Sequence, residues 1–174
     1  MDKLHTLAET LGAALKARGY VLILAESCTG GMVAEAITSV AGSSAWFDRA
    51  YVTYSNQSKI ELLNVLSETL NHYGAVSEQT AIEMALGCIN KVCLNKAGVI
   101  HGKNLIAGSI TGIAGPDGGT AQKPVGTVCF AWAGSDAPVQ TQTKVFSGNR
   151  QQIRHQATVF MLENLIQRLM PANT

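Results

Sequence analysis

Two short, mainly apolar segments are each followed at once by a glycine-rich stretch. YVLILA (20–25) runs directly into ESCTGG (26–31), and NLIAGSI (104–110) runs into TGIAGPDGG (111–119). Apolar runs of this length, rich in branched residues, are typical of strands buried on both faces, as in a parallel sheet covered by helices. Ligands in such folds bind at the carboxyl ends of the strands. We therefore expect the two glycine-rich stretches to meet at one edge of a sheet and to build a pocket there.

Helical patterns alternate with the apolar runs. Leucines at spacings of three and four predict an amphipathic helix from residue 4 to Arg18, ended by Gly19. The order of elements predicts an α/β fold, a three-layer α/β/α sandwich on a mixed, mainly parallel sheet of about five strands that ends in an antiparallel pair. Ser67 and Ser77 are expected as N-caps. Further helices are expected at 32–40, 55–65, 67–74, 78–96 and 149–170, and further strands at 50–54, 125–133 and 139–146.

The amount of apolar sequence supports one domain over residues 1–174. Of the 174 residues, 47% are hydrophobic and 14% are charged, which suits a compact domain with a continuous core. A net charge of +1 provides no broad attraction for a polyanion, so we expect no nucleic-acid partner. No stretch approaches the roughly 18 apolar residues that span a bilayer, and the N-terminus lacks the pattern of a signal peptide. We therefore expect a cytoplasmic protein without a membrane partner.

The cysteines and histidines do not indicate a metal site. The four cysteines, at positions 28, 88, 93 and 129, form no C-x-x-C pair. In a reducing compartment such cysteines are typical small buried residues, so we expect Cys88 and Cys93 in the core. The four histidines have no metal-ligand spacing among themselves or with the cysteines. The dinucleotide-binding, P-loop, S-x-x-K and G-x-S-x-G patterns are also absent from the sequence.

Ser27 stands where the first predicted strand passes into a helix. A hydroxyl at such a junction can reach solvent. The unpaired N–H groups of a helix start can stabilise an anion, either a substrate phosphate or the oxyanion of an acyl-transfer intermediate. The same stretch also fits a plain N-cap followed by a glycine turn. Both interpretations stay open on these residues alone.

A second polar segment is expected at the same sheet edge. In YVTYSNQSK, Tyr54 ends the second strand and Lys59 lies one turn into the following helix. A serine hydroxyl needs a base to act as a nucleophile at neutral pH, and a desolvated lysine with a lowered pKa is a candidate where no histidine is indicated. Tyr54 could then relay or orient a proton. The alternative is that Tyr54 belongs to the core and Lys59 to a solvated helix face.

Four motifs carry a resemblance to a known family over nearly the whole chain. This sequence resembles the C-terminal domain of the CinA (competence/damage-inducible) family in its standalone form. The resemblance implies an α/β/α domain, often a homodimer, that hydrolyses the carboxamide of nicotinamide mononucleotide to nicotinate mononucleotide and ammonia. It implies a small-molecule nucleotide substrate and no metal or organic cofactor. The motifs are, in order, AESCTGG (25–31), AGSSAWFDRAYVTYSNQSK (41–59), GAVSE (74–78) and TGIAGPDGGTAQKPVGTV (111–128).

The resemblance also implies catalytic roles for individual residues. The family's catalytic serine, tyrosine and lysine fall on Ser27, Tyr54 and Lys59. Lys59, held neutral, is expected to take the proton of Ser27, whose Oγ attacks the carboxamide carbon. Stabilisation of the oxyanion and part of the substrate binding are expected from the backbone N–H groups of Thr29, Gly30 and Gly31.

The remaining pocket residues are assigned in the same way. Arg150, with Arg154 one turn further, could hold a phosphate, and Cys28 is expected to be a neighbour rather than the nucleophile. Two features depart from the family pattern: the segment NKAGVIHGKNLIAGSI (95–110) is longer than expected, and Asn149 stands where an aspartate is more usual. The alternatives are a catalytically inactive nucleotide-binding paralogue and an amidohydrolase of a different carboxamide. The glycine-rich loop after the third strand is expected to line the pocket with Thr111, Gly112 and Gly115.

Overall fold

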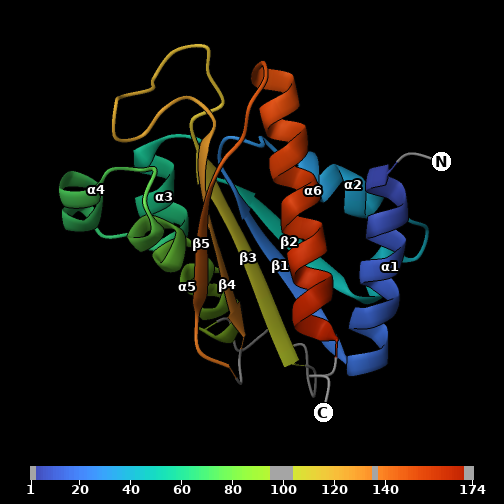
Figure 1. Ribbon diagram of the computed structural model, residues 1–174. Coiled ribbons are helices and arrows are strands. Elements are labelled where there is room, and N and C mark those ends of the chain that lie inside the picture. Colours follow the sequence, from blue (N-terminus) through green and yellow to red (C-terminus); the bar gives the residue numbers. More distant parts are fainter. Residues whose placement is uncertain (1–2, 95–103, 135–136, 171–174) are drawn as a thin grey trace.

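A five-stranded sheet forms the centre of the computed structural model, which describes residues 3–94, 104–134 and 137–170. The strand order is β2-β1-β3-β4-β5, with helices on both faces (Figure 1). β2 and β3 pair with β1 in parallel, whereas β4 is antiparallel to both of its neighbours, β3 and β5. Only β4 therefore runs against the others, which confirms the mixed, mainly parallel sheet. The strands are β1 (Tyr20–Glu26), β2 (Phe47–Val52), β3 (Asn104–Gly112), β4 (Thr127–Gly134) and β5 (Gln140–Val145).

Helices form the two outer layers, which confirms the three-layer α/β/α arrangement (Figure 1). One face is covered by α1 (Lys3–Arg18), α2 (Met32–Thr38) and α6 (Arg150–Leu169). The other face is covered by α3 (Asn56–Leu63), α4 (Ser67–Tyr73) and α5 (Glu78–Leu94). The expected end of α5 at residue 96 lies outside the described residues, as does the part 95–103 of the longer segment 95–110. None of the helices in the described ranges is long and apolar enough to cross a membrane.

Each face of the sheet has its own core because side chains alternate along β1. Leu22 and Leu24 pack among apolar residues of α1, α2 and α6, whereas Val21, Ile23 and Ala25 pack among those of α3 and α5. β1 is therefore buried on both faces, as its unbroken apolar run predicts. Since burial of one leucine side chain contributes about 1.5–3 kcal/mol, the two cores together hold the end of β1, and with it the following turn, in a defined place.

β2 begins and ends earlier than the expected range of 50–54. The Trp46 carbonyl accepts the Leu22 N–H group at 2.8 Å, so pairing with β1 starts before Ala50, the first residue of the expected strand. β2 therefore begins at Phe47 and ends at Val52. Tyr54 consequently lies in the loop that follows the strand.

Two further local expectations are corrected by the structure. Ser67 is the first residue of α4 rather than its N-cap, because Leu66 takes the cap position without a side-chain hydrogen bond. Ser77 does cap α5, since its Oγ accepts the Thr80 N–H group at 3.1 Å. Cys88 is buried as expected, but Cys93 is exposed. Five residues correspond to well over one turn of an α-helix, so the two cysteines lie on different sides of α5.

Candidate active site

The carboxyl ends of β1, β2 and β3 meet at one edge of the sheet (Figure 1). The Ser27 N–H group donates to the Ile110 carbonyl at 3.0 Å, and the Thr53 N–H group donates to the Glu26 carbonyl at 2.8 Å. These bonds join the turn after β1 to its neighbours on both sides. The two glycine-rich stretches therefore lie next to each other, as the sequence predicts.

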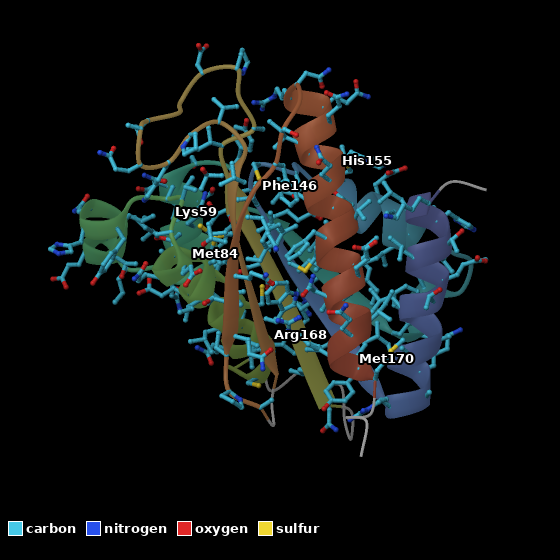
Figure 2. The ribbon with its side chains drawn as sticks, viewed as in Figure 1. Lys59, Met84, Phe146, His155, Arg168 and Met170 are labelled. Carbon is cyan, nitrogen blue, oxygen red and sulfur yellow. The ribbon has the colours of Figure 1, made fainter. Side chains whose placement is uncertain are left out.

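Ser27 and Lys59 are in hydrogen-bond contact at this edge. Lys59 Nζ lies 3.1 Å from Ser27 Oγ and donates to the Thr53 carbonyl at 2.8 Å. Lys59 is 1% exposed, and Figure 2 shows it on the α3 side of the sheet. Burial lowers the pKa of Lys59 from 10.5 to about 8, because desolvation penalises the charged amine. A neutral amine can donate to the Thr53 carbonyl and still direct its lone pair at the Ser27 hydroxyl.

The first turn of α3 determines where Lys59 leaves the helix. Ser55 Oγ accepts the Ser58 N–H group at 3.0 Å, and Ser58 Oγ accepts the Ser55 N–H group at 3.1 Å. This reciprocal pair is a capping box, which fixes the helix start. Lys59 follows one turn into α3, as expected, and its burial excludes the interpretation of a solvated helix charge.

A buried carboxylate holds the 27–31 turn. Glu26 is 0% exposed, and its carboxylate accepts N–H groups at the start of α2, where the N-cap residue Gly31 has no side chain to do so. Gly30 and Gly31 have φ values of 59° and 97°, which glycine adopts without strain. The glycine turn expected as a structural alternative is therefore present, and it leaves the Ser27 hydroxyl beside Lys59. The Glu26 carboxylate accepts hydrogen bonds of 2.7–3.2 Å from the Thr29 hydroxyl and from the N–H groups of Gly31, Val33 and Ala34.

Two of the three N–H groups expected to face an oxyanion are already paired. The Gly30 N–H group donates to the Ser27 carbonyl at 3.0 Å, and the Gly31 N–H group donates to the Glu26 carboxylate at 3.0 Å. In this structure these two groups close the turn on itself, in contrast to the expectation that they face an oxyanion. Within the described part of the chain, the N–H groups of Cys28 and Thr29 have no oxygen acceptor. The turn therefore leaves these two donors without an oxygen acceptor, and that of Cys28 has only its own thiol sulfur as a partner.

Tyr54 contacts Arg150 rather than the Ser27–Lys59 pair. The Tyr54 hydroxyl accepts a hydrogen bond from Arg150 Nη2 at 2.8 Å, and Arg150 Nη1 donates to the Gly115 carbonyl at 2.8 Å. Tyr54 is 61% exposed, so it is not a core residue. Among the residues that the structure describes, its hydroxyl has no second hydrogen-bond partner. A direct proton relay from Tyr54 to Lys59 is therefore absent from this arrangement.

A pocket of about 150 Å³ lies between these groups. Thr111 and Gly112 line it as expected, and the Thr111 hydroxyl donates to the Ala75 carbonyl at 2.7 Å. Gly115 reaches the site only through its carbonyl on Arg150, and it lies outside the described lining, as do Thr29, Gly30 and Gly31. Pockets for whole drug-sized ligands measure about 300–1,000 Å³, so this one fits part of a nucleotide. The lining also includes Ser27, Cys28, Tyr54, Lys59, Val76, Ala114 and Arg150.

Cys28 is unsuited to act as the nucleophile. It is 6% exposed, and burial raises the pKa of its thiol to about 12. The reactive form of cysteine is the thiolate, and this thiol stays protonated at neutral pH. Its place in the pocket lining agrees with the expected role of a neighbour.

Arg154 and Glu26 have contacts that the sequence did not reveal. Arg154 donates from Nε to the Cys28 carbonyl at 3.1 Å and from Nη2 to the Thr29 carbonyl at 2.8 Å. Its guanidinium therefore donates to backbone carbonyls of the turn, whereas the sequence had suggested a contact with phosphate. Glu26 could have been noticed as a charged residue at the end of an apolar run, directly before a helix. In the three described segments, no group of three or more His, Cys, Asp or Glu side chains could hold a metal ion.

Comparisons with known proteins agree with one another. A family model described as "CinA C-terminal domain" matches residues 4–169. A protein of Enterobacter agglomerans named "Nicotinamide-nucleotide amidohydrolase PncC" is 54% identical over 165 residues, covering 94% of each chain. Its namesake in Escherichia coli K12 is 48% identical over 169 residues, covering 97% of this chain and 96% of the relative. The crystal structure of competence/damage inducible protein CihA from Agrobacterium tumefaciens is similar with a TM-score of 0.85 and 38% identity, covering 96% of each chain.

Proposed function

Because this chain belongs to the CinA C-terminal domain family, we propose that it hydrolyses the carboxamide of nicotinamide mononucleotide to nicotinate mononucleotide and ammonia. The relatives that share about half of its sequence over nearly their whole length are named for this class of reaction. The observation that carries the proposal is the contact between Lys59 Nζ and Ser27 Oγ at 3.1 Å in a pocket. A site that only binds a nucleotide has no need to bury a lysine amine against a serine hydroxyl.

Ser27 is the proposed nucleophile and Lys59 the proposed base. The neutral Lys59 amine takes the hydroxyl proton as Ser27 Oγ forms a bond to the carboxamide carbon. The resulting ammonium then gives this proton to the leaving nitrogen, the C–N bond breaks and ammonia departs. Water, deprotonated by the same amine, attacks the ester, and cleavage of the Oγ–C bond regenerates Ser27 and releases the carboxylate. The pyridinium ring of the substrate withdraws electrons and makes the carboxamide carbon more electrophilic.

The oxyanion of each tetrahedral intermediate needs hydrogen-bond donors that are already in place. We assign this role to the N–H groups of Cys28 and Thr29, which follow the nucleophile directly and have no oxygen acceptor among the described residues. Gly30 and Gly31 contribute by allowing the turn rather than by contacting substrate. This assignment keeps Thr29 from the set expected from the sequence and substitutes Cys28 for Gly30 and Gly31.

The size of the pocket supports a bound nicotinamide ring with the ribose and phosphate outside. A volume of about 150 Å³ fits the ring and its carboxamide beside Ser27. Tyr54, which lines the pocket and is 61% exposed, offers its ring for stacking on the positively charged pyridinium. Arg150 lines the pocket beside it and supplies a guanidinium for the phosphate. Tyr54 thus positions the substrate in this proposal.

The test is ammonia release from nicotinamide mononucleotide by the purified protein, with Ser27→Ala alongside. We expect release by the wild type and a fall in kcat of about a thousandfold or more in the variant. The variant should still be protected against heat by the nucleotide, because binding does not need the hydroxyl. A fully active Ser27→Ala would overturn the mechanism. Thermal protection of a wild type that releases no ammonia would favour a binding paralogue.

A further inference from the structure

Arg154 joins the second turn of α6 to the turn that carries Ser27. Its Nε donates to the Cys28 carbonyl at 3.1 Å and its Nη2 donates to the Thr29 carbonyl at 2.8 Å. Both carbonyls lie about 125 residues earlier in the chain, so this contact exists only in the folded protein. The side chain is not part of the pocket lining among the described residues. Arg154 therefore contacts the turn without lining the pocket.

One of the two peptide groups whose N–H has no oxygen acceptor receives Arg154 directly. The Cys28 carbonyl and the Thr29 N–H group belong to the same peptide unit. A cation that hydrogen-bonds to the carbonyl oxygen draws electron density along this unit and makes its N–H group a stronger donor. The same bond holds the plane of the peptide, and so the direction of the Thr29 N–H group.

The second N–H group without an oxygen acceptor is reached through one further peptide. The Thr29 carbonyl, which accepts from Arg154 Nη2, shares its peptide unit with the Gly30 N–H group. That N–H group donates to the Ser27 carbonyl at 3.0 Å. The Ser27 carbonyl shares its peptide unit with the Cys28 N–H group. Arg154 thus begins a single hydrogen-bonded series. The series runs through two peptide units, the second of which carries the Cys28 N–H group, and each bond polarises the next.

We propose that Arg154 is a positioning residue that orients and strengthens the Cys28 and Thr29 N–H groups as oxyanion donors, an inference that rests on the proposed amide hydrolysis. The oxyanion develops only in the tetrahedral intermediate, so the effect of Arg154 appears in the transition state and not in substrate binding. Glu26 accepts hydrogen bonds from an N–H group of the turn, whereas Arg154 donates to its carbonyls. The turn is thus held by two charged groups of opposite sign, one on its donors and one on its acceptors.

The first test compares kcat and KM for Arg154→Gln, Arg154→Lys and wild type with nicotinamide mononucleotide. We expect Arg154→Gln to lower kcat by about tenfold to a hundredfold, less than the about 10²–10³-fold loss of an entire oxyanion donor. KM should change by less than about threefold, because ground-state contacts are kept. Arg154→Lys, which keeps the charge and one donor, should recover part of kcat. Arg18→Gln is the matched control, since Arg18 also donates to a backbone carbonyl of α6, that of Leu169 at 3.1 Å.

The second test uses an aldehyde analogue, the mononucleotide of pyridine-3-carboxaldehyde. Ser27 Oγ adds to its carbonyl carbon, the carbonyl oxygen becomes the alkoxide or hydroxyl of a hemiacetal, and that oxygen occupies the oxyanion position. Affinity for this analogue should fall in Arg154→Gln by the same factor as kcat, while the affinity of a Ser27→Ala, Arg154→Gln protein for nicotinamide mononucleotide stays at the level of Ser27→Ala. Thermal melting with and without nucleotide verifies that each variant is folded.

Two results would overturn the role of Arg154 while leaving the proposed function intact. One is an unchanged kcat in a folded Arg154→Gln protein. The other is a rise in KM for nicotinamide mononucleotide that disappears with nicotinamide riboside, because this would assign Arg154 to the phosphate. Absence of ammonia release from the wild type is a distinct result, which removes the proposed function and this inference with it.

Discussion

Lys59 Nζ lies 3.1 Å from Ser27 Oγ although 32 residues separate the two in the chain. The contact depends on the parallel pairing of β1 with β2, which brings the ends of both strands to one edge. Lys59 is then buried behind the pocket by the first turn of α3. Five properties of this arrangement can be tested by substitution.

The rate should depend on pH through Lys59. Its pKa is lowered to about 8, and only the unprotonated amine can accept the Ser27 proton, so kcat/KM should rise with pH and level off above about 8. Below this value the neutral fraction, and with it kcat/KM, falls about tenfold per pH unit. Lys59→Arg stays protonated and should lose activity across the whole range. A pH–rate profile of wild type and variant measures this, and a flat profile would remove Lys59 as the base.

The same lysine should make stability depend on pH. Its pKa is about 8 in the folded protein and 10.5 in an unfolded chain, so between these values the unfolded chain binds the extra proton. The contribution of Lys59 to stability therefore rises with pH across this window, and the cost of burying its charge applies below about pH 8. Between pH 7 and pH 10 the wild type should gain free energy of unfolding relative to Lys59→Met, because the buried cysteines, which act in the opposite direction above about pH 9, are the same in both proteins. Urea denaturation of both proteins at the two pH values measures this difference. Equal changes in both proteins would contradict the depressed pKa.

Cys28→Ala should remain active. The thiol is buried and protonated, so its loss removes packing rather than chemistry, and kcat should stay within about threefold of wild type while stability falls by about 1–2 kcal/mol. Steady-state kinetics and a melting curve provide both quantities. A loss of activity as large as that of Ser27→Ala would point to sulfur as the nucleophile.

Arg150→Gln should weaken binding of the phosphate. Loss of a charge-assisted contact of about 1.5–3 kcal/mol corresponds to a rise in KM of about tenfold to a hundredfold for nicotinamide mononucleotide. KM for nicotinamide riboside, which has no phosphate, should change little. The measurement is KM of wild type and Arg150→Gln for both substrates. An equal rise in KM for both would mean that Arg150 acts by shaping the pocket through Tyr54 and Gly115.

Glu26→Gln should destabilise the fold by about 3 kcal/mol, because the buried carboxylate accepts four hydrogen bonds and an amide group would face those donors with its own NH₂. Glu35→Gln is the control, since Glu35 lies exposed in the first turn of the same helix and should cost less than about 0.5 kcal/mol. Urea denaturation of the two variants measures the difference. Similar stabilities would show that the N–H groups of α2 do not need the carboxylate.

Much of the architecture follows from local sequence patterns. The unbroken apolar run of residues 20–25 predicts a strand buried on both faces, and the structure buries it between two cores. The expected cap at Ser77 is confirmed for a similar reason, since a hydroxyl directly before a helix accepts a backbone N–H group that lies within one turn, here that of Thr80. The start of β2 could not be predicted from its own residues, because it depends on the bond from Leu22 to the Trp46 carbonyl.

The candidate site was predictable in position but not in detail. Parallel strands place their following loops at one edge, so topology brings Ser27 and Lys59 to the same edge. Spacing alone also fits a solvated Lys59, and the pairing of the two residues is what the family resemblance implies. The partner of Tyr54, in contrast, comes from α6 near the other end of the chain. The pairing of Gly30 and Gly31 within the turn likewise depends on Glu26, which sequence analysis did not single out.

The sequence by itself determined which segments are strands, helices and glycine turns, because these depend on periodicity and on residues within a few positions of one another. Only the tertiary structure decided the chemical state of the side chains. The lowered pKa of Lys59 and the protonated thiol of Cys28 result from burial by distant elements. The guanidinium of Arg154 on α6 likewise donates to a carbonyl of the turn about 125 positions earlier in the chain. This bond acts on the turn whose Cys28 and Thr29 N–H groups have no oxygen acceptor among the described residues. Desolvation and long-range hydrogen bonding arise only when the chain is folded, so no local pattern encodes them.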